Sequence, residues 1–382
     1  GKISESAYNS AVSEQIALNR PQETEEQRNN YVDTYTYYCA TRALMQNEGF
    51  EFQYYFDNDD AEKTYDDLYD EMYAECQKKI YSGGYKIYTS IDLEKQADLQ
   101  SAVDSTLASF TETGDDGIYT LQGSAVCIDN DTGLVTAIVG GRSQDFTTYT
   151  LNRAYQSFRQ PGSCIKPVID YTPAFERSYT PDSIVKDEPI ENGPQNASKT
   201  YQGDVTIRYA VEQSLNTVAW KLYEEITPEA GLQYLKNMNF SQIKPADNTP
   251  ATSIGGFTIG MSTLEMASAY ATIENDGVYR EPTCVKSISD STDQVVYTLE
   301  PKETVIYKET ASRMMTDVLK SVMTNGLGRK MQLTNMISAG KTGTTNDNKD
   351  GWFCGYTRYY TTAVWVGYDI PQEVPGLAGG SY

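Results

Sequence analysis

The sequence predicts an α+β fold in which a five-stranded antiparallel sheet is flanked by helices and preceded by a small linker region. Runs with strand character lie at 124–139 and again at 336–368, near the two ends of the larger part of the chain. The segments between these runs have mainly helical patterns. Because strands from both ends bracket a helical middle, we expect one sheet built from distant segments, with helices packed on it.

The first part of the chain has the pattern of a small helical region. Apolar spacing predicts helices over 1–20, 26–48 and 61–80. The alternating run 85–91 predicts a strand, and Asp92 is a typical cap for the helix that follows it. The polar stretch Thr111–Gly117 indicates a boundary before the larger region.

The larger region contains the strands of the predicted sheet. Ser124–Asp129 and Leu134–Val139 are joined by Asn130-Asp131-Thr132-Gly133, which is a hairpin signal. Further strand-like runs lie at 336–344, 351–356 and 360–368. Helical patterns fill the middle, over 163–176, 205–226, 228–237, 262–275 and 309–324. We predict that the polar segment 186–203 is a long loop.

Composition excludes several classes of function. The formal net charge of −22 is an acidic excess that repels phosphate backbones, so we predict no nucleic-acid partner. The 382 residues include no histidine, which excludes Ser-His-Asp and Cys-His catalysis. Any nucleophile must therefore be activated by another group, and lysine is the leading candidate.

The cysteines predict neither a metal site nor a cofactor. They stand at positions 39, 76, 127, 164, 284 and 354, without C-x-x-C spacing, and most are expected to be small buried hydrophobes. A disulfide between Cys39 and Cys76 is compatible with the sequence, but their spacing does not support it. No run of about 18 apolar residues occurs, so we expect no membrane-spanning segment.

Three short motifs carry the candidate chemistry, and the first is Ser163-Cys164-Ile165-Lys166. Pro161-Gly162 ends the preceding segment and an apolar helical pattern follows, so we expect Ser163 at a helix N-terminus. Lys166 would then lie one turn later on the same side. Such an end offers free N–H groups and positive partial charge. Alone, the motif also fits an ordinary serine followed by a solvent-exposed lysine.

The other two motifs are Ser214-Leu215-Asn216 and Lys341-Thr342-Gly343-Thr344. Each has an ordinary structural interpretation, because serine and asparagine often cap helices and a glycine-bracketed run fits an edge strand. The last motif is not a phosphate-binding loop, since the pattern G-x-x-x-x-G-K-[ST] requires glycine where this chain has Asn335.

Taken together and in this order, the motifs S-x-x-K, S-x-N and K-T-G resemble the signature of penicillin-binding proteins and serine β-lactamases. The resemblance to class A, bifunctional penicillin-binding proteins extends over most of the chain. It includes Arg159-Gln160-Pro161-Gly162-Ser163, the block Glu265–Thr272, and closing strands around Trp352 and Trp365. The resemblance implies a penicillin-binding/serine β-lactamase-like transpeptidase fold.

The same resemblance divides the chain. Residues 1–25 would be the C-terminal remnant of a glycosyltransferase domain, 26–119 an interdomain linker region, and 120–382 the transpeptidase domain. The chain opens at Gly1-Lys2 without a signal peptide, so we expect the rest of the glycosyltransferase and a membrane anchor upstream. The implied location is the extracytoplasmic face of the cell membrane, held only through that anchor.

The resemblance also implies how the nucleophile is activated. Ser163 would attack the substrate carbonyl and Lys166 would take its proton. Lys341 would be the nearby cation that, together with burial, lowers the pKa of Lys166. Ser214 would relay a proton to the departing nitrogen, and Asn216 would orient Lys166 and contact the substrate peptide.

Substrate binding is implied for the last motif. Backbone N–H groups of Ser163 and Thr344 would hold the oxyanion. The side chains of Lys341, Thr342 and Thr344 would bind a terminal carboxylate, and Gly343 would let the substrate lie along the strand. The implied substrate is a peptidoglycan stem peptide ending in D-Ala-D-Ala, and β-lactam antibiotics would acylate the same serine. An amine of a neighbouring stem peptide would resolve the acyl-enzyme and form the cross-link.

Two other functions fit the same motifs. A D-Ala-D-Ala carboxypeptidase or serine β-lactamase would use water as the acceptor, and a non-catalytic penicillin-binding module would act as a sensor or scaffold. Class A β-lactamases add a glutamate for deacylation, and no Glu-x-x-Leu-Asn-type segment lies between Asn216 and Lys341. Glu265 is expected to cap or pair at the start of its helix. The sequence therefore predicts slow deacylation.

Overall fold

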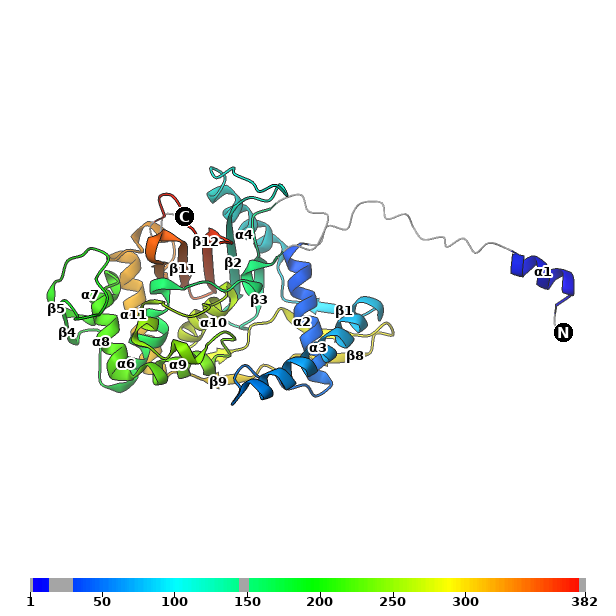
Figure 1. Cartoon of the computed structure of the whole chain (residues 1–382), viewed down its shortest axis with the longest axis horizontal. Helices are drawn as coiled ribbons and strands as arrows, with labels where there is room; N and C mark the ends of the chain where they lie inside the picture. The colour runs from blue at the N-terminus through cyan, green and yellow to red at the C-terminus, as the bar shows by residue number, and fades with distance from the viewer. Residues whose placement is uncertain (1–2, 14–29, 144–150, 378–382) are drawn as a thin grey trace.

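The computed structural model describes residues 3–13, 30–143 and 151–377. Within them, a five-stranded antiparallel sheet of order β10-β11-β12-β2-β3 forms the centre of the larger region (Figure 1). Its strands are β2 (Leu121–Asp129), β3 (Val135–Val139), β10 (Ala339–Thr344), β11 (Asp350–Tyr356) and β12 (Tyr360–Tyr368). The sheet predicted from strands at both ends of the region is confirmed.

Alternation along the strands puts two sets of side chains on opposite faces of the sheet. Ala125 faces a small apolar cluster that includes Val103 of α4 (Leu93–Thr106). Val126, one residue later, belongs to the larger core, against which α10 (Thr263–Glu274) packs. The sheet is therefore covered by helices on both faces, as the predicted layers require.

Most of the predicted helices of the middle region form. The helices there are α5 (Arg153–Gln156), α6 (Thr172–Arg177), α7 (Ile207–Glu212), α8 (Asn216–Ile226), α9 (Pro228–Asn237), α10 and α11 (Glu309–Thr324). The helices predicted over 228–237, 262–275 and 309–324 are confirmed within one residue at each end. Helix α11 packs along β10 and α10, which places it beside the edge strand of the sheet.

The continuous helix predicted over 163–176 is wrong. The chain instead forms a 3-10 turn at Gly162–Cys164, a π turn at Pro167–Tyr171 and only then α6. Pro167 has no backbone N–H to donate to an α-helical ladder, so the hydrogen bonds shift to wider spacing after it. The first N–H after the π turn, that of Thr172, donates to Pro167 O.

The helix predicted over 205–226 is also interrupted. Its first residues belong to the short strand β5 (Gly203–Thr206), and α7 and α8 are separated at Ser214. Ser214 adopts a φ of +56°, a left-handed conformation that ends α7 and turns the chain before α8. Apolar spacing continues across this break, which is why the sequence pattern does not reveal it.

The first part of the chain follows its predictions closely. Its elements are α1 (Glu5–Ser13), α2 (Tyr31–Asn47), α3 (Asp59–Ser82), β1 (Lys86–Thr89) and α4. Asp92 caps α4 as predicted, because its side chain accepts from the backbone N–H groups of Glu94 and Lys95. The remainder of the helix predicted over 1–20 lies outside the described residues.

Three small sheets were not predicted, because their partners are far apart in sequence or very short. Strand β1 pairs with β7 (Val285–Ser289), which also pairs with β8 (Val295–Thr298). The second sheet joins β6 (Val278–Arg280) to β9 (Glu303–Val305). The third joins β4 (Ile184–Asp187) to β5, so the ends of the predicted loop 186–203 are paired. Pairing of β1 with β7 ties the first part of the chain to the larger region.

Candidate active site

Ser163 lies half-buried in the 3-10 turn, packed directly against the edge strand β10. Gly162 has a φ of +52°, and a Cβ atom there would lie 2.8 Å from Thr344 O. A Cβ atom on Gly255 would lie 2.5 Å from the Cα atom of Gly162. Glycine at 162 is therefore required both by conformation and by the close approach of three backbone segments.

Lys166 is fully buried behind this turn. Its Nζ donates to Asn216 Oδ1 at 2.7 Å, to Ser214 O at 2.8 Å and to Leu215 O at 3.3 Å. Burial lowers the pKa of Lys166 well below its usual value, and the charge of Lys341 lowers it further. An amine in this environment is more easily deprotonated than an exposed lysine.

Lys341 is the second fully buried lysine of the site. Its Nζ donates to Ser214 Oγ at 2.8 Å and to Thr342 O at 3.0 Å. Burial lowers the pKa of Lys341 to about 8. One serine therefore contacts both lysines, through its hydroxyl on one side and its carbonyl on the other.

The structure brings Lys166, Ser214, Asn216 and Lys341 together in one hydrogen-bonded cluster. The hydroxyl of Ser163 makes no hydrogen bond to any of these four in the described part of the chain. The predicted substrate-binding residues lie on the adjoining strand, where Thr342 is buried, Gly343 is buried and Thr344 is half-buried.

Packing of the serine turn leaves no room for a side chain at Gly343. A Cβ atom there would lie 2.6 Å from Pro161 O and 3.0 Å from Cys164 Sγ. Cys164 Sγ itself donates to Lys341 O at 3.2 Å. The glycine therefore lets the serine turn pack against β10, and the predicted role of Gly343 in binding the substrate stays a prediction.

Residues that sequence reasoning missed hold the Ser-x-Asn segment in place. The side-chain oxygen of Asn196 accepts from the backbone N–H of Asn216 at 2.8 Å, and its Nδ2 donates to Asp187 at 2.7 Å. The Nδ2 of Asn216 donates to Gln195 O at 2.8 Å. These partners belong to the segment predicted as an ordinary loop, and no local pattern distinguishes them from other polar loop residues.

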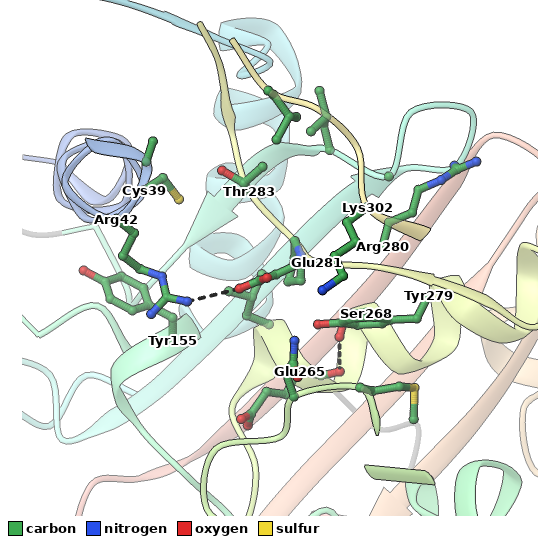
Figure 2. A pocket seen from close by; sticks show the side chains of 18 of the residues that line it. Cys39, Arg42, Tyr155, Glu265, Ser268, Tyr279, Arg280, Glu281, Thr283 and Lys302 are labelled. Carbon is green, nitrogen blue, oxygen red and sulfur yellow. Dashed lines mark hydrogen bonds and ion pairs between the residues drawn. The ribbon is translucent and has the colours of Figure 1, made fainter. Parts of the chain in front are cut away.

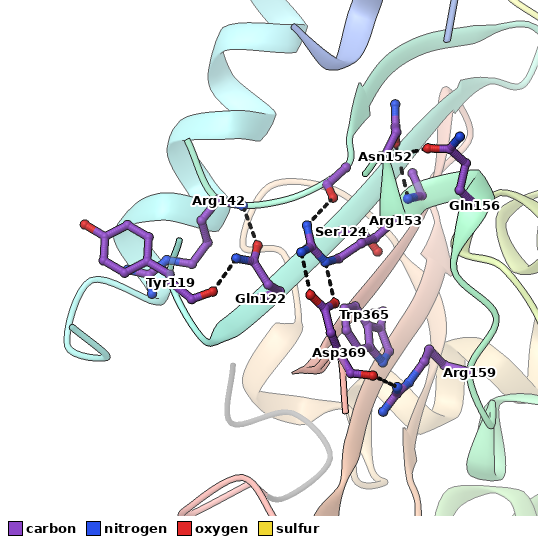
Figure 3. Close-up of polar contacts among 12 residues, drawn as sticks. Tyr119, Gln122, Ser124, Arg142, Asn152, Arg153, Gln156, Arg159, Trp365 and Asp369 are labelled. Carbon is purple, nitrogen blue, oxygen red and sulfur yellow. Dashed lines mark hydrogen bonds and ion pairs between the residues drawn. The ribbon is translucent and has the colours of Figure 1, made fainter. Parts of the chain in front are cut away.

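The segment that leads to Ser163 is anchored by two buried arginines (Figure 3). Arg153 binds both carboxylate oxygens of Asp369 at 2.6 Å. Arg159 donates to Asp350 Oδ1 at 2.7 Å and to Asp369 O at 3.0 Å. Trp365 Nε1 donates to the same oxygen of Asp350 at 3.0 Å. These contacts fix the approach to the serine turn against β11 and β12.

Arg159→Met should lower the free energy of unfolding by about 3–5 kcal/mol, because it leaves the Asp350 carboxylate buried without its cationic partner. Both side chains of this pair are less than a tenth exposed. Urea denaturation of the two proteins measures the difference. Arg313→Met is the control, since Arg313 pairs with Asp276 and Glu309 at the surface, and the loss there should be about 0–1 kcal/mol. Equal losses in the two variants would contradict the role of Arg159.

Asp170 is a buried carboxyl group one turn beyond Lys166. It is fully buried, and neither carboxylate oxygen has a hydrogen-bond partner among the described residues. Burial raises its pKa well above the usual value, although the charge of Lys166 opposes this shift. Burial therefore favours the protonated form of Asp170 in the folded protein, whereas the carboxyl ionises above about pH 4 in the unfolded chain.

Asp170→Asn should consequently stabilise the protein at pH 7. The folded protein binds one more proton than the unfolded chain above about pH 4, so this carboxyl costs stability as the pH rises toward its folded pKa. Asparagine keeps the shape of the side chain and removes its titration. Thermal unfolding of both proteins between about pH 4 and pH 8 should show a difference in melting temperature that shrinks toward pH 4. A less stable variant at pH 7 would mean that Asp170 is ionised in the fold.

Glu265 caps α10, as predicted. Its carboxylate accepts from the backbone N–H of Ser262 at 2.8 Å, while Ser262 Oγ accepts from the N–H of Glu265. The other oxygen accepts from the N–H of Ser241 at 2.7 Å. Both oxygens are thus used in structural contacts, away from the lysine cluster.

All six cysteines are free thiols, so the disulfide considered between Cys39 and Cys76 does not form. Within the described ranges, no group of three or more His, Cys, Asp or Glu side chains is arranged to hold a metal ion. No helix of the described residues is both long and apolar enough to cross a membrane.

The fold and the meeting of S-x-x-K, S-x-N and K-T-G at one sheet edge are typical of the class of penicillin-binding proteins and serine β-lactamases. The model of the penicillin-binding protein transpeptidase domain matches residues 123–382. The chain therefore belongs to the penicillin-binding protein transpeptidase family, and its relatives associate it with the class A members.

Individual relatives support this assignment. Penicillin-binding protein 4 of Bacillus subtilis is 30% identical over 99% of this chain and 58% of that protein. Penicillin-binding protein 1A of Clostridium perfringens is 33% identical over 82% of this chain and 50% of that protein. The chain thus spans about half the length of the curated relatives it matches.

Solved structures share the fold. Penicillin-binding protein 1A from Haemophilus influenzae superposes with a TM-score of 0.72 at 20% identity, covering 99% of this chain and 72% of that chain. The PonA1 protein from Mycobacterium tuberculosis, in complex with penicillin V, gives a TM-score of 0.69 at 22% identity, covering 91% of this chain and 88% of that chain.

Proposed function

We propose that this chain is a D,D-transpeptidase that cross-links peptidoglycan stem peptides ending in D-Ala-D-Ala through an acyl-enzyme on Ser163. The observation that carries the proposal is the buried cluster in which Lys166 and Lys341 share Ser214. Two buried, mutually repelling lysines provide what a serine nucleophile needs in a chain without histidine: an amine whose pKa is lowered well below its usual value.

Lys166 is proposed as the base that takes the Ser163 proton. Its Nζ now donates to three acceptors, a set that only the ammonium form satisfies in full. The neutral amine has two N–H groups, so the longest of these contacts, 3.3 Å to Leu215 O, is the one it would release. The freed lone pair would then accept the Ser163 proton, a contact expected to tighten only when substrate is bound.

The acyl transfer would proceed in two balanced steps. In the first, the oxygen of Ser163 bonds to the carbonyl carbon of the penultimate D-Ala, and the bond to the last D-Ala nitrogen breaks after that nitrogen gains a proton relayed through Ser214. In the second, the amine nitrogen of a neighbouring stem peptide bonds to the same carbon, the ester bond to Ser163 breaks, and the proton lost by the amine returns to the Ser163 oxygen through Lys166. Backbone N–H groups of Ser163 and Thr344 are proposed to hold the oxyanion. In support, the backbone nitrogen of Thr344 lies close to the serine turn, since a Cβ atom added to Gly162 would lie 3.1 Å from it.

Thr342, Gly343 and Thr344 are proposed to line the substrate strand, with Lys341 supplying charge to the terminal carboxylate. β-Lactams are proposed to acylate the same serine. Structures of relatives in complex with penicillin V and ampicillin support this proposal.

Deacylation by water should be slow. The carboxylate of Glu265 is occupied by its capping contacts and does not touch the lysine cluster. We expect each chain to consume about one equivalent of penicillin and then stop, whereas a β-lactamase turns over repeatedly. The amount of penicilloate formed over time, with and without an added D-amino acid acceptor, measures this. Sustained penicillin hydrolysis would favour a β-lactamase. Release of the acyl group to water alone, with no transfer to the added acceptor, would favour a carboxypeptidase.

We also propose a division of the chain. Residues 1–25 would end a glycosyltransferase domain, 26–119 would form the linker region, and 120–382 would form the transpeptidase domain. In the whole protein, an upstream glycosyltransferase and membrane anchor would place this domain on the extracytoplasmic face. The relatives extend well beyond this chain, which covers 58% and 50% of their lengths, and this supports the proposal.

The direct test is to map the penicillin adduct. The chain is incubated with a fluorescent penicillin, digested, and analysed by tandem mass spectrometry. We expect one adduct, on the peptide that contains Ser163. An adduct on another residue would overturn the site, and the absence of an adduct in a folded chain would favour a scaffold without acylation chemistry.

A further inference from the structure

A cavity of about 260 Å³ lies away from the lysine cluster. One wall is α2, which contributes Arg42, and another is α10, which contributes Ser268 (Figure 2). The chain around β6 and β8 closes it with Tyr279, Glu281 and Lys302. None of the residues proposed for acyl transfer lines this cavity.

Tyr279 presents an unused polar group to the cavity. Its side chain is only 4% exposed, and its hydroxyl makes no hydrogen bond within the described part of the chain. Figure 2 shows that hydroxyl directed into the cavity, toward the side from which the Lys302 amine also enters. A hydroxyl that faces the cavity without a protein partner is available to donate to a ligand that enters it.

Two exposed side chains around the cavity, Lys302 and Glu300, form no ion pair within the described residues. Arg42 is engaged with Glu281 at 3.1 Å and with the Tyr54 hydroxyl at 2.8 Å. Arg280 is paired with Glu303 at 2.8 Å. Lys302, by contrast, forms no ion pair with any carboxylate of the described residues.

The free polar groups are thus complementary to a carboxylate with an N–H group beside it. The Lys302 ammonium and the Tyr279 hydroxyl are donors that suit a carboxylate. Glu281, which is 41% exposed, can accept from a neighbouring amide. The remaining walls include aromatic rings that can pack against an apolar body, those of Tyr38, Tyr155, Phe158 and Tyr297.

We propose that this cavity is a binding site for the carboxylate end of a short peptide, with Lys302 and Tyr279 holding the carboxylate and Glu281 accepting from the last amide. The cavity also touches the segment that leads to the serine turn, through Tyr155 and Phe158. The proposal does not depend on acylation at Ser163.

The test is calorimetric titration of the full chain with N-acetyl-alanyl-alanine and with its C-terminal carboxamide. The chain is used both after acylation by penicillin V, which fills the proposed active site, and as Ser163→Ala. We expect the acid to bind about 10-fold more tightly than the carboxamide in both forms, as one charge-assisted hydrogen bond allows.

Three variants assign the site. Lys302→Met should weaken the acid about 10-fold and leave the carboxamide unchanged, and Tyr279→Phe should weaken the acid about 2–10-fold. Lys286→Met, which removes an exposed lysine on β7 outside the cavity, should change neither. An unchanged midpoint of thermal unfolding confirms that each variant is folded. Equal binding of acid and carboxamide, no saturable binding up to about 10 mM, or an insensitive Lys302→Met would overturn the proposal.

Discussion

Ser163→Ala should abolish covalent labelling by penicillin while leaving the fold intact. The hydroxyl makes no hydrogen bond to the lysine cluster, so its removal breaks no structural contact there. It removes the only proposed nucleophile, and loss of such a group costs on the order of a million-fold in rate in enzymes that use an activated serine. Incubation with fluorescent penicillin followed by gel electrophoresis measures the labelling.

Thermal unfolding provides the control for this variant. Its midpoint should match that of the parent chain within about 2 °C, because the Ser163 side chain is only half-buried and its loss changes stability little. Ser312→Ala is a matched substitution, at a buried serine on α11 away from the cluster, and it should label normally. Labelling of Ser163→Ala at the parental rate would eliminate Ser163 as the acylated residue.

Lys166→Met should reduce the acylation rate by about 100–10,000-fold, the range typical for loss of a positioned base. Methionine fills the buried space of the lysine stem, so the core should remain packed. The Asn216 and Ser214 acceptors lose their donor, and a modest loss of stability is expected from these unpaired groups. Stopped-flow measurement of acylation gives the rate, and Lys320→Met, an exposed lysine on α11, should react like the parent chain.

The pH dependence of acylation separates a base from a structural lysine. The pKa of Lys166 is lowered by burial and by Lys341, so its neutral form is available at a lower pH than for an exposed lysine. The parent rate should rise as the pH increases through that lowered pKa and then level off. In Lys166→Met this rise of the acylation rate with pH should be absent. A variant that is slower at every pH by the same factor would show that Lys166 only supports the fold.

Local sequence patterns predicted much of the architecture. The hairpin signal Asn130-Asp131-Thr132-Gly133 and the strand-like runs at both ends of the region predicted the five-stranded sheet. The sheet forms with all its pairings antiparallel. Asp92 and Glu265 were correctly interpreted as caps, because capping depends on residues only two or three positions away. What failed were the helices across Ser214 and Pro167, where apolar spacing continues through a break in the backbone.

The sequence by itself determined the order and chemistry of the three motifs and excluded a histidine-based mechanism, since these depend only on which residues are present. Only the tertiary structure decided that Ser214 contacts both lysines, that Asn196 and Asp187 brace Asn216, and that Gly343 makes room for the serine turn. The physical reason is that burial, hydrogen-bond partners and steric clearance arise between separate segments, which lie 20 residues apart for Asn196 and Asn216 and 127 apart for Ser214 and Lys341. Local periodicity carries no information about which segments meet.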